Sequence, residues 1–114
     1  MATGTINKPR VLTNSTSNSL AFGYMYADDT YVYIEKGKLL FSSYRNPILC
    51  CYTTQQGGMR VFLLFSGRTS GDWTLTVTGI YGVDNATATL DGDNIKISGI
   101  GGNWGQGYAI GLSK

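Results

Sequence analysis

The feature that most constrains the fold is an alternation of aromatic residues on either side of a turn signal near the start of the chain. Aromatic side chains occupy every second position before and after residues 27–30: Phe22, Tyr24 and Tyr26, then Tyr31 and Tyr33. Alternation with a period of two, in aromatic and β-branched residues, is typical of β-strands. We therefore expect a hairpin whose connection is Ala27-Asp28-Asp29-Thr30.

This hairpin predicts a register. If residues 27–30 connect the strands, Tyr26 pairs with Tyr31, Tyr24 with Tyr33 and Phe22 with Glu35. Directly opposite residues of an antiparallel pair share one face, so the four tyrosines lie together. Two interpretations remain open. The tyrosines face an opposing sheet within the core, or they point outward as an aromatic binding surface.

The other face of the hairpin carries Met25, Val32 and Ile34, which would suit a core. The next turn, at Gly37, does not decide between the interpretations. A two-residue loop there pairs Phe41 with Val32, whereas a three-residue loop with a bulge pairs Phe41 with Tyr31. The orientation of the tyrosines therefore depends on the register at this turn.

Strand patterns and turn signals alternate along the rest of the chain, and no window shows sustained helical periodicity. The expected strands are Leu20 to Tyr26, Tyr31 to Ile34, Leu39 to Ser43, Ile48 to Thr53, Arg60 to Phe65, Trp73 to Ile80, Ala86 to Leu90, Ile95 to Ser98 and Tyr108 to Leu112. A turn at residues 91–94 pairs Leu90 with Ile95 and Ala88 with Ile97. We predict an all-β fold, an antiparallel two-sheet sandwich or jelly roll of about eight to nine short strands.

Length and composition indicate one domain. The 114 residues are enough to bury a core without a metal or a disulfide. Residues 1–18 are polar and predict an extended N-terminal arm or an edge strand, and residues 19–114 predict a single β-sandwich domain. Residues 66–71 are expected to form a turn.

The charges argue against a nucleic-acid partner. Nine Lys and Arg residues against seven Asp and Glu give a net charge of +2, and the cations are dispersed singly rather than clustered along one segment. The longest apolar stretch, residues 61–65, is far shorter than the roughly 20 residues that span a bilayer, so no membrane insertion is expected. Residues 1–5 have neither the basic start nor the apolar segment of a signal peptide.

The two cysteines are adjacent. Neighbours on a strand point to opposite faces, so Cys50 and Cys51 are expected to be free thiols, at least one of them buried. Free thiols indicate synthesis in a reducing compartment.

Catalytic and metal-binding patterns are missing from the sequence. There is no histidine, and every acid pair that is close in sequence falls on an expected turn. Asp91 and Asp93 have no terminal glutamate that would complete a calcium loop. We expect no catalytic residue, no metal and no cofactor.

Two groups of residues remain as candidates for binding. The first is the set of four tyrosines, and the second is the glycine-rich segment around Trp104, which either plugs the end of the core or stands on a loop. The candidate ligand-binding residues are Tyr24, Tyr26, Tyr31, Tyr33, Asn103, Trp104, Gln106 and Tyr108. Exposed aromatic side chains beside amides favour a glycan or a protein over a charged ligand.

Three features of the sequence carry a resemblance to a known class of proteins. They are the opening residues Met1-Ala2-Thr3-Gly4-Thr5-Ile6-Asn7-Lys8-Pro9, the short Tyr-, Thr- and Gly-rich strands, and the segment Trp104-Gly105-Gln106-Gly107-Tyr108-Ala109-Ile110. The chain resembles small tail or fibre-tip proteins of phages and prophages of gut bacteria. The resemblance implies a non-catalytic, trimeric virion or virion-like component, made in the bacterial cytoplasm, that contacts a host-surface glycan or a neighbouring tail protein. A free-standing carbohydrate-binding lectin is the alternative.

Overall fold

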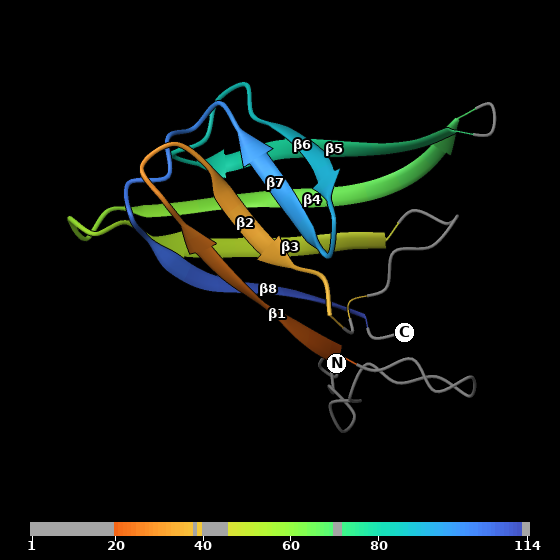
Figure 1. The fold of residues 1–114 in the computed structure, drawn as a ribbon, viewed down its shortest axis with the longest axis horizontal. Coiled ribbons are helices and arrows are strands. Elements are labelled where there is room, and N and C mark those ends of the chain that lie inside the picture. The colour runs from red at the N-terminus through yellow and green to blue at the C-terminus, as the bar shows by residue number, and fades with distance from the viewer. Residues whose placement is uncertain (1–19, 38, 40–45, 70–71, 113–114) are drawn as a thin grey trace, which may run out of the picture.

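The computed structural model describes residues 20–37, 39, 46–69 and 72–112, and these form eight strands and no helix (Figure 1). The strands are β1 (Leu20–Ala27), β2 (Val32–Glu35), β3 (Asn46–Thr53), β4 (Met59–Thr69), β5 (Asp72–Tyr81), β6 (Thr87–Asp91), β7 (Asn94–Ser98) and β8 (Gln106–Leu112). The part of the chain described here has no helix of the length and apolarity needed to cross a membrane. The predicted all-β class is confirmed.

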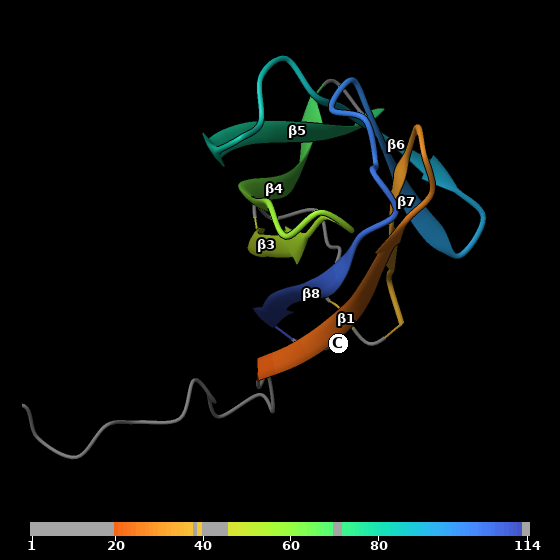
Figure 2. The same ribbon diagram turned by 90° about the vertical axis from the view of Figure 1, so that its left-hand side faces the viewer.

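All eight strands belong to one antiparallel sheet, in the order β5-β4-β3-β8-β1-β2-β7-β6. Figure 2 shows how this sheet curls: β3, β4 and β5 form one side, β8 and β1 form the base, and β2, β7 and β6 form the other side. The two edge strands, β5 and β6, contact each other. The sheet is thus nearly closed and barrel-like.

This arrangement differs from the predicted sandwich or jelly roll. The expected division into two sheets is not seen in the described strands, because β8 pairs with β3 on one side and with β1 on the other. Hydrogen bonding therefore continues from one side of the molecule to the other, and the right-handed twist of the strands curls the sheet upon itself. Alternation within each strand predicts a buried face, but it does not say whether that face meets a second sheet or the same one.

The first hairpin is displaced from its predicted register. Tyr26 pairs with Tyr33 rather than with Tyr31, because the connection is residues 28–31. The carboxylate of Asp28 accepts hydrogen bonds from the backbone N–H groups of Thr30, at 2.8 Å, and Tyr31, at 2.7 Å. These bonds fix the turn one residue later than predicted. The partner of each β1 residue therefore shifts by two residues along β2, and because side chains alternate with a period of two, the tyrosines still share a face.

Both registers considered for the turn at Gly37 involve Phe41, which lies outside the described residues. Among the described strands, β2 pairs with β1 along one edge and with β7 along the other, with Val32 opposite Ile97. Residues 40–45, and with them most of the expected strand from Leu39 to Ser43, lie outside the described residues, as do residues 1–19 and the expected N-terminal arm.

The remaining strands match their predictions closely. The turn at residues 91–94 pairs Leu90 with Ile95 and Ala88 with Ile97, as predicted. The expected turn over residues 66–71 was too long, since β4 continues to Thr69, which pairs with Asp72. Serine, threonine and glycine in that segment suggested a loop, but pairing with β5 holds residues 66–69 in the sheet.

The core fills the inside of the curled sheet. Its fully buried side chains come from six strands and from the segment after β2: Met25, Val32, Ile34, Leu39, Ile48, Cys50, Tyr52, Phe62, Leu64, Ile95, Ile97 and Ala109. Burial raises the pKa of the Cys50 thiol, whereas Cys51, on the opposite face of β3, is half-buried. Both cysteines are free, as predicted.

Candidate functional site: a row of tyrosines on the outer face

Five tyrosine rings form a continuous row across β8, β1, β2 and the turn before β2, which we call the tyrosine row. Its members are, in order, Tyr108, Tyr24, Tyr26, Tyr33 and Tyr31. Successive ring centroids are 6.1, 6.0, 5.2 and 6.4 Å apart. The two central contacts are stacked, with interplanar angles of 24° and 22°, and the two outer contacts are edge-to-face.

The tyrosine row lies on the outer face of the sheet. Met25, Val32 and Ile34 alternate with the tyrosines and are completely buried, so the inner face of these strands belongs to the core. Tyr108 is 58% exposed and Tyr24 is 38% exposed. Of the two interpretations that the sequence left open, the outward orientation is the one in the structure.

Polar groups accompany the rings along the row. The hydroxyl of Tyr24 donates a hydrogen bond to Oε1 of Gln106, at 2.8 Å, and Nδ2 of Asn94 donates to the hydroxyl of Tyr26, at 3.3 Å. At the far end, Nζ of Lys96 lies 3.9 Å from the centroid of the Tyr31 ring. The row therefore combines apolar ring faces with hydroxyl and amide groups and has a single cation at one end.

The loop that carries Asn103 and Trp104 lies against the turn of the first hairpin. The N–H groups of Gly102 and Asn103 donate to the carbonyl of Asp29, and that of Trp104 donates to the carbonyl of Asp28. Trp104 is 60% exposed and so does not plug the core. Asn103 and Trp104 both adopt positive φ angles, 53° and 52°.

Arg60 on β4 supports this loop from inside. Its Nη1 donates to the carbonyl of Ile100 and, at 2.8 Å, to the carbonyl of Gly101. The hydroxyl of Tyr52 lies 3.5 Å from the same Gly101 carbonyl, and burial raises the pKa of Tyr52. The loop is therefore attached both to the neighbouring turn and to the end of the core.

Gly102 makes this attachment possible. A Cβ atom at this position would overlap the carbonyl oxygen of Asp28 and would lie 2.7 Å from that of Tyr31. Glycine is required here because the two backbones approach each other closely. Gly102, one of the glycines around Trp104, thus permits tight contact between the loop and the turn of the first hairpin.

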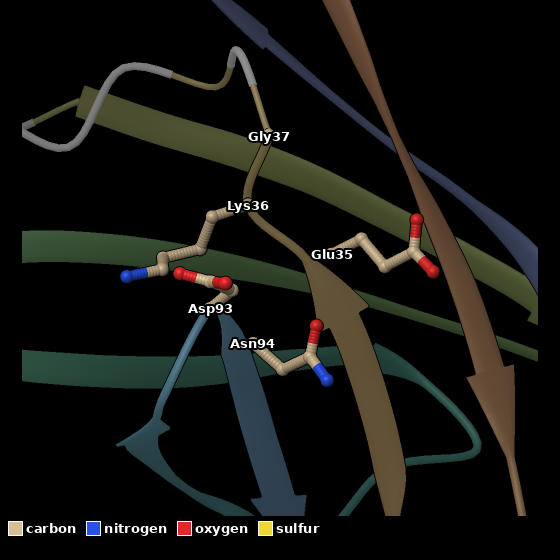
Figure 3. A pocket seen from close by; sticks show the side chains of 5 residues that line it. All are labelled: Glu35, Lys36, Gly37, Asp93 and Asn94. Carbon is tan, nitrogen blue, oxygen red and sulfur yellow. The ribbon is translucent and has the colours of Figure 1, made fainter.

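A hollow lies where β2 ends and β7 begins, and it is lined by Glu35, Lys36, Gly37, Asp93 and Asn94. Figure 3 shows that its two carboxylates do not converge: that of Glu35 points away from that of Asp93, which lies beside the side chain of Lys36. Among the described residues, no three His, Cys, Asp or Glu side chains are grouped so that they could hold a metal ion.

The structure brings together the tyrosines of both candidate groups and Gln106, since Tyr108 and Gln106 on β8 contact Tyr24 on β1. It places Asn103 and Trp104 at the adjoining loop, both exposed. Sequence reasoning did not identify Asn94 and Lys96 as neighbours of the tyrosines, and it did not predict that β8 pairs with β1. The alternation in residues 94–98 places both side chains opposite the buried Ile95 and Ile97, but nothing in the sequence pairs that strand with β2.

Comparisons with models of protein families, with curated proteins and with solved structures found no match.

Proposed function

We propose that this chain is a non-catalytic recognition module that binds a neutral glycan along the tyrosine row. The observation that carries the proposal is the outward row of five rings, backed by a completely buried inner face. Aromatic rings pack against the apolar faces of sugar rings, here mainly through the edges of the central rings because these stack on each other, while hydroxyl and amide groups beside them bond to sugar hydroxyls.

The form of the row favours an extended oligosaccharide over a single terminal sugar. The row is open, and its ring-to-ring steps of 5.2 to 6.4 Å are close to the length of one pyranose unit. A glycan running from β8 to β2 would therefore meet a new ring at each sugar. Lys96, at the Tyr31 end, is the one position of the row where an acidic substituent would find a cation.

The setting that we propose is the tail of a phage or prophage, where the module would contact a host-surface glycan. This part of the proposal is supported by the resemblance described above, which also implies assembly in the bacterial cytoplasm as a homo-oligomer. A free-standing lectin would use the same row. The two roles differ in whether the module is attached to other tail proteins, and a neighbouring tail protein is the alternative occupant of the row.

A glycan array followed by titration calorimetry tests the proposal. Wild-type protein is expected to bind neutral oligosaccharides, and Tyr33→Ala to weaken binding about tenfold, which corresponds to about 1.4 kcal/mol for one lost ring contact. Trp104→Ala tests whether the adjoining loop contributes. Tyr81→Ala is the matched control, because Tyr81 is 63% exposed on β5, away from the row.

Each variant is first checked for its melting temperature. Loss of binding in Tyr33→Ala, with unchanged melting and normal binding in Tyr81→Ala, supports the proposal. Equal effects of the two tyrosine substitutions, or no glycan bound by the wild type at millimolar concentration, would refute it.

A further inference from the structure

A second part of the outer face, beside the tyrosine row, is apolar. Phe22 on β1 pairs with Ile110 on β8, Ile110 pairs with Leu49 on β3, and Leu49 pairs with Leu63 on β4. These four residues therefore form one line across four adjacent strands, which we call the apolar line. Phe22 is 64% exposed and Leu49 is 41% exposed.

The same four strands are also apolar on their inner face, where Ala21, Ala109, Cys50 and Phe62 are buried. An antiparallel sheet that faces water on one side normally alternates apolar and polar residues. Strands that are apolar on both faces are typical of a sheet covered on both sides. The inner cover is the core, whereas on the outer face the residues that the structure describes leave Phe22 and Leu49 exposed.

The surface around the apolar line is almost without charge. Residues that share the outer face with it, by their pairing and alternation, are Leu20, Tyr24, Tyr26, Cys51, Thr53, Met59, Val61, Phe65, Gln106 and Tyr108. None of these side chain types ordinarily carries a charge at neutral pH. Two identical faces of this kind can meet without repulsion between like charges, and no charged pattern is present that would select a different partner.

The extent of this face fits a protein interface. Four strands at a spacing of about 4.8 Å, with seven residues at a rise of about 3.4 Å, cover on the order of 450 Å² in projection. Side-chain relief raises the accessible area above the projected area, toward the roughly 800 Å² that each partner contributes to a stable complex. Residues 1–19 are a poor cover, since Ile6, Val11 and Leu12 are the only large aliphatic residues that follow Met1.

We propose that the apolar line is the surface by which this chain associates with a second copy of itself. The outer face it uses includes Tyr24, Tyr26, Gln106 and Tyr108 of the tyrosine row, so a second copy and a glycan would compete for this part of the face. Glycan binding and self-association are measured separately, so the failure of one proposal is distinguishable from the failure of the other.

Light scattering on the full chain tests the association. The wild type is expected to have a mass of at least twice 12.3 kDa, and F22T/L49T the mass of one chain. Threonine keeps the β propensity of the exposed positions, and circular dichroism checks the fold. Leu90→Thr is the matched control, because Leu90 is 57% exposed on β6, outside this face, and it should keep the wild-type mass.

A second measurement needs no substitution at the interface. Cys51 shares the outer face with the apolar line, so its labelling by a maleimide should slow at least several-fold as the concentration of the wild-type protein rises, while the buried Cys50 stays unlabelled. A wild type of single-chain mass at about 100 µM would overturn the proposal. So would F22T/L49T that keeps the wild-type mass, or an I6S/V11S/L12S variant that alone dissociates the assembly.

Discussion

At the scale of single residues, Asp28 sets the position of the first turn and hence the arrangement of the tyrosine row. Its carboxylate accepts hydrogen bonds from the N–H groups of Tyr31 and Thr30, and these bonds lower the pKa of Asp28 below its ordinary value of 3.8. The folded state therefore favours the ionised carboxylate. The same turn offers its carbonyls to the loop of Trp104.

A pH dependence follows from this lowered pKa. The contribution of Asp28 to stability is fully present above pH 3.8 and is lost as the pH falls through the lower, folded-state pKa. Wild-type protein should thus melt at a higher temperature than Asp28→Ala at pH 7, and the gap should shrink below pH 3.8. Thermal melts of both proteins from pH 7 to pH 2 measure it, with the exposed Asp84→Ala as the control. A gap that stays constant over this range would contradict the role assigned to the carboxylate.

At the scale of strands and loops, alternation predicted where the strands lie and which residues share a face, but it left open which face of the first hairpin is buried. The strand Leu20 to Tyr26 and the turn at residues 91–94 were located to within a residue or so because each combines period-two alternation with a turn signal. The hairpin register was wrong because two backbone hydrogen bonds to Asp28 moved the turn, and alternation does not encode such bonds. Most of the tyrosine row could be predicted, but its extension to Tyr108 could not, since it depends on β8 pairing with β1.

The loop of Trp104 was the least predictable element, because glycine patterns do not reveal that Arg60 holds the loop. Arg60→Met keeps the apolar stem but loses the hydrogen bonds to the carbonyls of Ile100 and Gly101. Bonds from a charged donor contribute about 1.5–3 kcal/mol, so urea denaturation should show a destabilisation of about that size. Hydrogen exchange at residues 102–105 should also become faster.

Arg60→Lys is the companion variant, since it keeps the charge and one of the donors and should recover part of the stability. If Arg60→Met were as stable as the wild type and exchanged equally slowly at residues 102–105, the loop would not depend on this arginine.

At the scale of the whole molecule, the outer face of one continuous sheet carries both the tyrosine row and the apolar line. β1 and β8 carry both the tyrosine row and part of the apolar line, at different positions along the same strands. The sequence did not predict this arrangement, because sandwich and barrel-like sheets share the same alternation within each strand. A single curved sheet places both surfaces on one rigid body, and because Tyr24 and Tyr108 lie on the same outer face as Phe22 and Ile110, a ligand on the row and a second copy on the apolar line would compete for part of that face.

The central claim is that the tyrosine row is the ligand-binding surface. The most direct test is nuclear magnetic resonance of the ¹⁵N-labelled full chain during titration with a neutral oligosaccharide identified on the array. The account predicts that the shifting amides belong to Tyr24, Tyr26, Tyr33, Gln106 and Tyr108. Shifts confined to the hollow around Glu35 and Asp93, or to the contact between β5 and β6, would contradict it.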